Sequence, residues 1–330
     1  MSKIATSDSR RILVVRLGAM GDVIHTLPAV ASLKHSFPGS HLTWLVEAQW
    51  APLLEGNPYV DSIAIFGRGG PGAWMHSWRK LRAARFDFAV DFQGLIKSAI
   101  GASMARPDRI FGFHQSQLRE RASALFYSNY TMAQAAHVVD RNLELAAAAG
   151  AVNSLRTFPL PEGVSEGELP SSGFVLANPL AGWRSKQWPL MFYSRLATRL
   201  KRELELPLLL NGPPGANPFA SVPSAVPYQS TLTGLIYATR RATAVIGIDS
   251  GPLHLAAALG RPGVAIFGPT DPARTGPYGE TIGVLRSPRA VSTYKRLSTI
   301  DPAMRDIDPD CVFEALKAQL SRRGAECAAP

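Results

Sequence analysis

Short apolar runs alternate with longer amphipathic segments along the whole chain of 330 residues. The first run, residues 11–17, reads RILVVRL and ends at Gly18, which is typical of a strand buried on both faces of a parallel sheet. The next segment, residues 22–37, has the period of a helix and stops before the breaker pair Pro38-Gly39. This rhythm of strand, turn and helix predicts an α/β fold.

The alternation runs to the C-terminus in two series. In the first series, a helix closes at residues 83–85, further strands are predicted at 41–47, 60–66 and 86–93, and helices at 94–106 and 133–149. A stretch rich in Pro, Gly, Glu and Ser, residues 159–172, predicts a linker. In the second series, strands are predicted at 174–180, 206–212, 244–250 and 263–268, and helices at 189–203, 231–241, 251–259 and 308–322. The pattern predicts two facing Rossmann-like domains, residues 1–160 and 161–330, with a C-terminal helix.

The turn after the first predicted strand reads GAMGD, residues 18–22. Its glycines allow a tight turn and let a ligand approach the backbone. The spacing differs from GxGxxG, so the dinucleotide-binding fingerprint is missing. Two interpretations of Asp22 stay open. It is a helix N-cap, which Asp fills well, or a general base that takes a proton from an acceptor hydroxyl.

A similar turn, DSGP at residues 249–252, joins a predicted strand to a helix. The free N–H groups and the positive dipole end of such a helix favour a phosphate group. His254 lies in the first helical turn and can face the same anion. The alternative is plain capping by the Asp or Ser of this turn, with His254 packed or solvated.

Lys186 lies with Arg184 in a loop after a predicted strand and can offset the charge of a diphosphate, although a lone loop lysine is more often only solvated. Metal binding has weak support. The loose Asp-x-Asp patterns at residues 306–310 immediately precede a helix, where acidic residues usually cap or occupy the first turn. The chain has no HExxH, CxxC, P-loop or GxSxG motif.

Composition narrows the partners and the compartment. The hydrophobic fraction is 46%, the charged fraction is 18% and the formal net charge is +10. Such a charge favours phosphates, acidic glycolipids or an anionic membrane surface, whereas no zinc finger, RNP signature or long basic run indicates nucleic acid. Cys311 and Cys327 lack metal-ligand spacing and fit a reducing compartment. Residues 1–10 have no signal-peptide core, and no apolar run reaches transmembrane length, so we expect a cytoplasmic protein with at most peripheral contact with the inner membrane.

Several motifs occur together in one order along residues 11–320. They are MGDVIHTLPA (20–29), DFQGLIKSA (91–99), LFY (125–127), HVVDR (137–141), KQWP (186–189), DSGPLHL (249–255) and GPTDP (268–272). With these motifs, the chain resembles glycosyltransferase family 9, the heptosyltransferases of lipopolysaccharide synthesis. The resemblance implies a GT-B fold and an inverting, metal-independent transfer of heptose from ADP-heptose, with no cofactor. It also implies an anionic glycolipid acceptor, the Kdo inner core on lipid A.

The resemblance also implies roles for individual residues. Asp22 matches the catalytic base. The implied donor-binding residues are Gly182, Lys186, Asp249, Ser250, Gly251 and His254. The implied acceptor-binding residues are Arg119, His137 and Arg141.

The sequence departs from the family pattern in two places. Family members often have a Glu for the ribose hydroxyls after the second strand of the C-terminal domain, but residues 212–218 here read GPPGANP, without an acid. The basic loop after the third strand is short, with Arg68 followed by Gly69-Gly70. A transferase using another nucleotide sugar is therefore the main alternative. A Rossmann oxidoreductase and a non-catalytic glycolipid-binding protein are the others.

Overall fold

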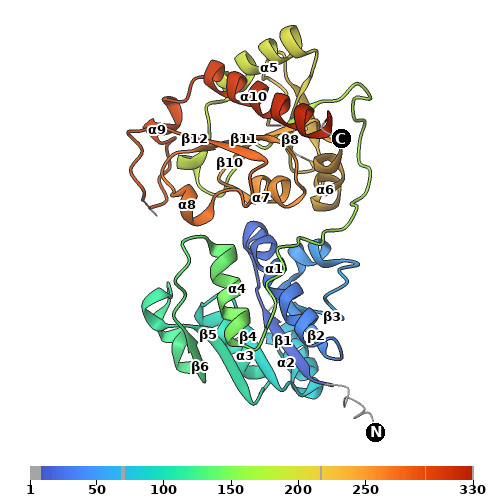
Figure 1. Cartoon of the computed structure of the whole chain (residues 1–330), viewed down its shortest axis with the longest axis vertical. Helices are drawn as coiled ribbons and strands as arrows, with labels where there is room; N and C mark the ends of the chain where they lie inside the picture. The colour runs from blue at the N-terminus through green and yellow to red at the C-terminus, as the bar shows by residue number, and fades with distance from the viewer. Residues whose placement is uncertain (1–8, 68–70, 216–217, 294, 329–330) are drawn as a thin grey trace. The chain divides into compact units, whose positions relative to one another are not determined.

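The computed structural model describes residues 9–67, 71–215, 218–293 and 295–328. The chain divides into two compact units, Met1–Pro161 and Glu162–Pro330. Each unit contains a six-stranded parallel sheet with helices around it (Figure 1). The predicted α/β class, with two Rossmann-like domains and a C-terminal helix, is confirmed.

In the first unit the strand order is β3-β2-β1-β4-β5-β6. The strands are β1 (Arg11–Val15), β2 (His41–Glu47), β3 (Ser62–Phe66), β4 (Phe88–Asp91), β5 (Arg109–Phe113) and β6 (Asn129–Thr131). The helices are α1 (Met20–Ser36), α2 (Pro71–Ala84), α3 (Ile96–Met104) and α4 (Val138–Ala148), with 3-10 helices η1 (Ala48–Leu54), η2 (Gln115–Gln117) and η3 (Arg121–Phe126).

The first apolar run explains the centre of this sheet. In β1, Ile12 to Val15 are fully buried, because helices cover both faces of the strand. The chain moves outward from β1 through β2 to β3 and then returns to β4 on the other side of β1. The carboxyl ends of β1 and β4 therefore form the point where the strand order reverses, which is where ligands bind in open α/β sheets.

In the second unit the order is β12-β11-β10-β7-β8-β9. The strands are β7 (Val175–Ala177), β8 (Leu208–Gly212), β9 (Val226–Gln229), β10 (Ala244–Ile248), β11 (Gly263–Phe267) and β12 (Ile282–Arg286). The helices are α5 (Leu190–Leu204), α6 (Leu232–Arg241), α7 (Gly251–Ala258), α8 (Pro272–Thr275), α9 (Pro302–Arg305) and α10 (Pro309–Ala328), with the 3-10 helix η4 (Arg184–Lys186).

The reversal in this second sheet lies between β7 and β10. Trp188, beside this point, is buried and donates from Nε1 to the carbonyl oxygen of Ile307 at 2.9 Å. Its ring meets that of Tyr193 edge-on, with centroids 4.8 Å apart. α10 packs against α5 and β11. These contacts fix the loop that follows β7 against the core of the unit.

The structure corrects several predicted boundaries. α1 begins at Met20, two residues before the predicted start, and α4 begins at Val138, five residues after it. The run predicted as a strand at 174–180 is a strand only over Val175–Ala177. The predictions also missed four strands, β5, β6, β9 and β12. Of these, β6, β9 and β12 are edge strands. An edge strand has a neighbour on one side only, so its pattern of apolar residues is weak.

Most of the stretch predicted as a linker is attached to the second unit. The Glu166 carboxylate accepts hydrogen bonds from the backbone nitrogen and the hydroxyl of Thr231, at 2.7 Å and 2.5 Å. Val164 donates to the carbonyl oxygen of Thr233. The start of α6 therefore holds this segment in place. The departure at Arg68–Gly70 lies outside the described residues, and so do residues 216–217 of the departure at 212–218.

Candidate active site

In the first unit, Asp22 lies in the first turn of α1, beside the carboxyl end of β1. Its Oδ1 pairs with Arg16 Nη2 at 2.7 Å, and its Oδ2 accepts from the backbone nitrogen of Ala19 at 3.2 Å. The N-cap position is Ala19, so the interpretation of Asp22 as the N-cap is wrong. Its carboxylate nevertheless binds a backbone N–H at the helix start, and 43% of its side chain stays exposed.

Arg16 is the residue that fixes Asp22. Its side chain is only 8% exposed, and its Nη1 donates to the carbonyl oxygen of Phe92, which directly follows β4. The guanidinium thus joins the ends of β1 and β4 and holds one carboxylate oxygen of Asp22. Among the described residues, the other oxygen accepts only the long bond from Ala19.

The surrounding loop leaves no room for larger residues at Gly18. A Cβ there would lie 2.6 Å from Trp50 Nε1, so only glycine fits this turn. Close by in the fold, Lys97 Nζ pairs with Glu47 Oε1 at 3.0 Å, and the Glu47 side chain is buried. The pattern of apolar positions gave no sign of this pair.

A second buried carboxylate, Asp91, ends β4. It accepts hydrogen bonds from Ser98 Oγ at 2.8 Å, Tyr127 Oη at 2.8 Å and the backbone nitrogens of Gln93 and Gly94 at 2.9 Å and 3.3 Å. Burial raises the pKa of Asp91 despite these donors, and burial together with the charge of Asp91 raises the pKa of Tyr127. Two of these donors are the backbone nitrogens of Gln93 and Gly94, so Asp91 fixes the loop after β4, whose Phe92 carbonyl oxygen accepts from Arg16.

The three predicted acceptor-side residues come from two segments of the first unit, the start of α4 and the turn between η2 and η3. His137 is the N-cap of α4, where its Nδ1 accepts from the backbone nitrogen of Val139 at 3.2 Å, and its ring lies 5.6 Å from that of His25 in α1. Arg141, one turn later, lies with its guanidinium 5.5 Å from the ring centre of Phe113. Arg119 is exposed and lies between η2 and η3. His137 and Arg141 thus share the start of α4, which packs on α1.

In the second unit, three predicted donor-side residues do meet. Lys186 Nζ lies 2.5 Å from Asp249 Oδ2, and His254 Nε2 lies 3.7 Å from Asp249 Oδ1. Burial by itself would raise the pKa of Asp249, but the neighbouring His254 and the charge of Lys186 outweigh it and lower the pKa to about 2. Since β7 and β10 are neighbours, residues 63 positions apart form an ion pair at the point where the strand order reverses.

Three hydroxyl groups near this ion pair are buried and have no hydrogen-bond partner within the described ranges. They belong to Ser185, Ser250 and Thr270, which follow β7, β10 and β11. These strands are adjacent in the sheet. A buried hydroxyl without a partner costs about 1–3 kcal/mol, so three at one sheet edge indicate a site for a polar ligand or water. Ser185 and Thr270 were not predicted, because neither stands out in the sequence.

The start of α7 adds to this polar edge. Ser250 is its N-cap but makes no side-chain capping bond, and Gly251 begins the helix with Pro252 behind it. The free backbone N–H groups of this first turn lie at the positive end of the helix dipole, and both favour an anion there. Of the two residues predicted as caps, Ser250 occupies the N-cap position but makes no side-chain capping bond, and Asp249 is paired with Lys186.

Gly182 and Trp183 belong to the loop between β7 and η4, just before Lys186. A Cβ added at Gly182 would meet nothing within 4 Å, so the position is open. Trp183 holds two cations over its ring: Lys186 Nζ lies 4.4 Å from the ring centre, and Arg296 Cζ lies 5.5 Å from it. Neither Trp183 nor Arg296 was a predicted site residue.

A chain of hydrogen bonds runs along the ends of β7, β8 and β9. Asn211 Nδ2 donates to Asn178 Oδ1 at 2.9 Å, and Ser230 Oγ donates to Asn211 Oδ1 at 2.8 Å. This neutral polar chain lies just before residues 212–218, where family members often have an acid. The asparagines therefore supply polar groups at that end of the sheet without a negative charge.

The acidic residues at 306–310 have partners of their own. Asp306 accepts from Ser287 Oγ at 2.6 Å and from Arg289 Nε at 3.1 Å, and these bonds lower its pKa. Asp308 accepts from the backbone nitrogen of Asp310 at 2.8 Å, and Asp310 pairs with Arg199 at 2.9 Å. Across the part of the chain that the structure describes, no group of three or more His, Cys, Asp or Glu side chains is placed to hold a metal ion.

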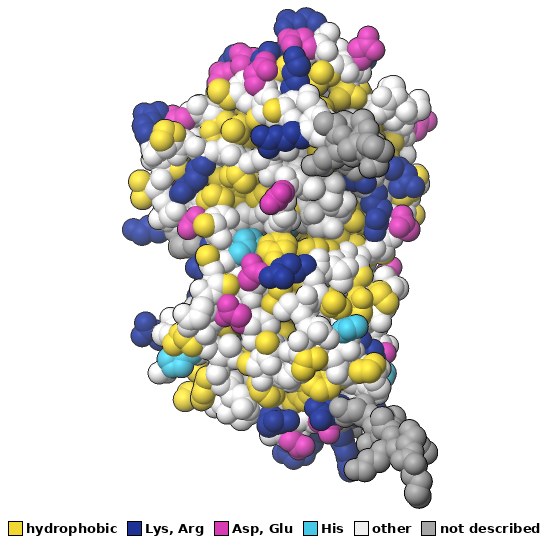
Figure 2. Space-filling view, viewed as in Figure 1, with side chains coloured by type: hydrophobic (Ala, Val, Ile, Leu, Met, Phe, Trp, Pro, Cys, Tyr) yellow, Lys and Arg dark blue, Asp and Glu magenta, His cyan; other side chains and the backbone are white. Residues whose placement is uncertain are grey.

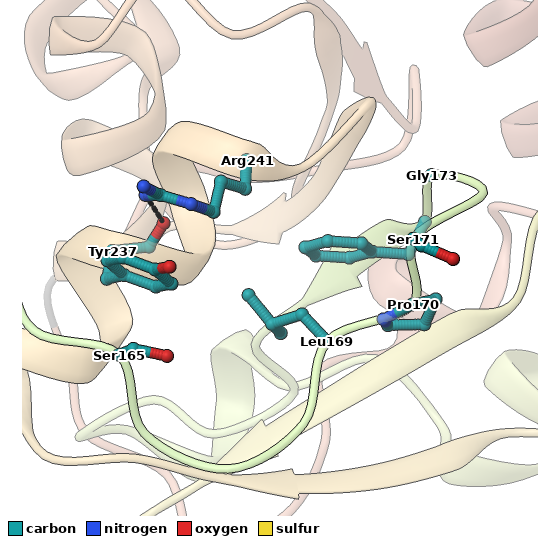
Figure 3. A pocket seen from close by; sticks show the side chains of 8 residues that line it. Ser165, Leu169, Pro170, Ser171, Gly173, Tyr237 and Arg241 are labelled. Atoms are coloured by element: carbon teal, nitrogen blue, oxygen red, sulfur yellow. Dashed lines mark hydrogen bonds between the residues drawn. The ribbon is translucent and has the colours of Figure 1, made fainter.

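A cavity of about 460 Å³ lies elsewhere in the second unit, beside the amino ends of β7 and β10. Figure 3 shows Tyr237 and Arg241 on one wall, with Leu169 and Pro170 opposite. None of the predicted site residues lines it. The candidate donor site is thus a set of polar groups at the opposite, carboxyl edge of the same sheet.

Comparison with known proteins decides the family. The profile of glycosyltransferase family 9 (heptosyltransferase) matches residues 74–303. The chain belongs to glycosyltransferase family 9. This family 9 protein is thus a glycosyltransferase, and the matched segment contains every site residue predicted from the sequence except Asp22.

Two curated relatives of this glycosyltransferase carry the same name. It is 30% identical to lipopolysaccharide heptosyltransferase 1 of Escherichia coli K12, over 84% of this chain and 94% of that protein. It is 29% identical to lipopolysaccharide heptosyltransferase 1 of Pseudomonas aeruginosa, over 82% of each.

Solved structures show the same fold. The E. coli heptosyltransferase WaaC with ADP has a TM-score of 0.76 at 24% identity, covering 94% of this chain and 99% of that one. A family 9 glycosyltransferase from Veillonella parvula has a TM-score of 0.79 at 20% identity, covering 96% and 98%. The GT-B fold is confirmed. No helix within the described ranges has both the length and the hydrophobicity needed to cross a bilayer.

Proposed function

We propose that this enzyme transfers heptose from ADP-heptose to the Kdo sugar of the lipopolysaccharide inner core, with inversion and without a metal ion. The observation that carries the proposal is the polar edge of the second sheet. There, Lys186, Asp249 and His254 meet three buried hydroxyls that have no partner among the described residues. The proposal is also supported by the names of the curated relatives and by the E. coli WaaC structures that contain ADP and ADP-2-deoxy-2-fluoro heptose.

On this proposal, residues 161–330 form the nucleotide-sugar domain. The donor diphosphate binds at the start of α7, where the N–H groups of Ser250 and Gly251 and the helix dipole favour an anion. Lys186 supplies a positive charge to the leaving group, in place of the metal ion that some sugar transferases use. The hydroxyls of Ser185, Ser250 and Thr270 donate to phosphate or sugar oxygens, which removes the cost of burying them unpaired.

Residues 1–160 form the acceptor domain, and Asp22 acts as the general base. Arg16 holds one oxygen of its carboxylate, and the other takes the proton of the acceptor hydroxyl. The acceptor oxygen then bonds to the anomeric carbon while the bond from that carbon to the diphosphate oxygen breaks. The electron pair leaves with ADP. A single displacement of this kind inverts the anomeric carbon, as in inverting glycosidases, with a sugar hydroxyl replacing water.

An anionic glycolipid fits the charge of the protein. The net charge is +10, and Arg119, His137 and Arg141 are the proposed partners of acceptor carboxylates or phosphates. On the face drawn in Figure 2, the described Lys and Arg side chains are spread over both units instead of gathering in one patch. We place the enzyme in the cytoplasm, in peripheral contact with the inner membrane, and expect no nucleic-acid partner.

The experiment that tests the function is a two-step screen. Thermal shifts with ADP-, GDP- and UDP-sugars identify the donor, since a ligand that binds the native state raises its stability. Mass spectrometry then measures heptose transfer onto Kdo-lipid A. Binding of ADP-heptose without any transfer to Kdo acceptors would overturn the acceptor assignment. Preference for a GDP- or UDP-sugar would favour the alternative that the missing acid at 212–218 raises.

A further inference from the structure

The loop between β12 and α9 brings a second cation to the proposed donor site. Arg296, in this loop, lies with its Cζ 5.5 Å from the ring centre of Trp183. Two backbone hydrogen bonds fix the loop there: Asp301 donates to Ser185 at 3.2 Å, and Thr293 donates to Pro269 at 2.8 Å. These bonds attach Thr293 and Asp301 to the segments that follow β11 and β7, which also contain Thr270 and Ser185.

The charges already present at this edge cancel. Lys186 lies 2.5 Å from Asp249, and the pKa of Asp249 is lowered to about 2, so its carboxylate is ionised at neutral pH. The pair as a whole is close to neutral. A diphosphate that approaches it meets one positive and one negative group, and the helix terminus contributes only about half a charge. Tight binding of a diphosphate at this edge therefore needs another cation.

Arg184, Arg286 and Arg296 come from the segments at this edge. Arg286 already donates to the carbonyl oxygen of Gly268 and to Ser292 Oγ, at 3.4 Å and 2.8 Å. Arg184 and Arg296 are both exposed. Arg296 differs because its guanidinium lies on the indole of Trp183, the same ring that Lys186 contacts at 4.4 Å. A planar guanidinium held against a ring keeps its N–H groups directed and loses less entropy when it binds a phosphate than a free side chain does.

We propose that Arg296 is a diphosphate-binding residue of the donor site and that Trp183 is the positioning residue that holds it beside Lys186. The inference rests on the proposed function and deepens it. Arg296 donates to the phosphate oxygens of the nucleotide sugar and offsets the charge that builds on the diphosphate as the sugar leaves. Arg296 thereby completes a site that the neutral Lys186–Asp249 pair leaves short of positive charge.

Calorimetry with ADP and adenosine tests this assignment. Arg296→Gln should weaken ADP binding about 10- to 100-fold and leave adenosine binding unchanged, because one charge-assisted contact to phosphate is lost. Arg296→Lys should fall between the two, since it keeps the charge but not the planar fork. The matched control is Arg305→Gln, which removes an equally charged, exposed arginine from the nearby helix α9. It should change neither affinity.

The role of Trp183 has its own readout. Trp183→Leu should weaken ADP binding, and its effect combined with Arg296→Gln should be smaller than the product of the two single effects, because both act through one contact. Fully multiplicative losses would overturn the positioning role.

Three outcomes would overturn the assignment of Arg296. The first is an ADP affinity of Arg296→Gln equal to that of the wild type. In that case, heptose transfer by the wild type would leave the proposed function standing. The second is equal losses of ADP and adenosine affinity, because they would indicate a disturbed fold instead of a lost phosphate contact. If the wild type binds no ADP at all, the proposed function and this inference fail together.

Discussion

The buried pair of Lys186 and Asp249 offers the sharpest test of the donor edge. Lys186→Met removes the charge but keeps most of the side-chain volume. Asp249, whose side chain is 8% exposed, then keeps His254 as its neighbour, with Nε2 3.7 Å from Oδ1. Breaking a buried ion pair by removing one partner costs about 3–5 kcal/mol. We expect this variant to be destabilised by that order at neutral pH.

The pH dependence gives the magnitude a second check. The pKa of Asp249 falls from 3.8 to about 2 on folding, and each pKa unit is worth about 1.4 kcal/mol. The environment of Asp249 thus contributes roughly 2 kcal/mol, to which both Lys186 and His254 add. Because the pKa is lower in the folded state, this stability is fully present above pH 3.8 and is lost as the pH falls toward 2. In Lys186→Met, the charge and the hydrogen bond of Lys186 no longer lower the pKa of Asp249, so the stability lost between neutral pH and acid should be smaller in the variant than in the wild type.

Urea unfolding between pH 3 and 8 measures these effects, and hydrogen exchange of peptides from β10 and α7 assigns them to the second unit. The double variant Lys186→Met/Asp249→Asn should recover most of the stability, because no unpaired carboxylate is buried. Its affinity for ADP should stay low, because the positive charge of Lys186 is still missing. The matched control is Arg195→Met, which breaks an exposed pair with Asp308 at 3.6 Å and should cost about 0–1 kcal/mol. Equal stability of Lys186→Met and wild type across this pH range would refute the reasoning.

Four further outcomes are expected. Asp22→Asn should keep ADP affinity but lower turnover about 10²–10⁴-fold, and turnover within a few-fold of wild type would leave Asp22 with only its structural bonds. Arg119→Ala and Arg141→Ala should each raise the acceptor KM about tenfold or more, with less effect in high salt; equal use of a neutral acceptor would contradict this. Thr270→Ala should leave the ligand-free protein as stable or more stable, yet weaken ADP-heptose binding in calorimetry; a loss of stability would show that its hydroxyl has a partner. Transfer should continue in excess EDTA. Loss of transfer on chelation, followed by recovery when Mg²⁺ is added, would show that a metal ion is needed.

The sequence alone determined the class of the fold and the positions of most central elements. The apolar runs at β1, β4, β10 and β11 become fully buried strands, because a strand covered by helices on both faces must be apolar throughout. Breaker residues marked most helix ends to within a few positions. The strands that escaped detection include β9, which contains Pro227 and is half exposed. Its side chains carry little hydrophobic signal because an edge strand has only one neighbour.

Tertiary structure decided the site. The sequence indicated Lys186, Asp249 and His254 separately, but only the pairing of β7 with β10 brings the lysine to 2.5 Å from the carboxylate. Likewise, Asp22 was visible, whereas Arg16, which holds it, read as part of an apolar strand. Ser185, Thr270 and Arg296 have ordinary sequence contexts and gain a role from burial or from a neighbouring ring. The physical reason is that hydrophobic periodicity reports how each segment is buried, while contact between distant side chains depends on strand order, which local sequence does not encode.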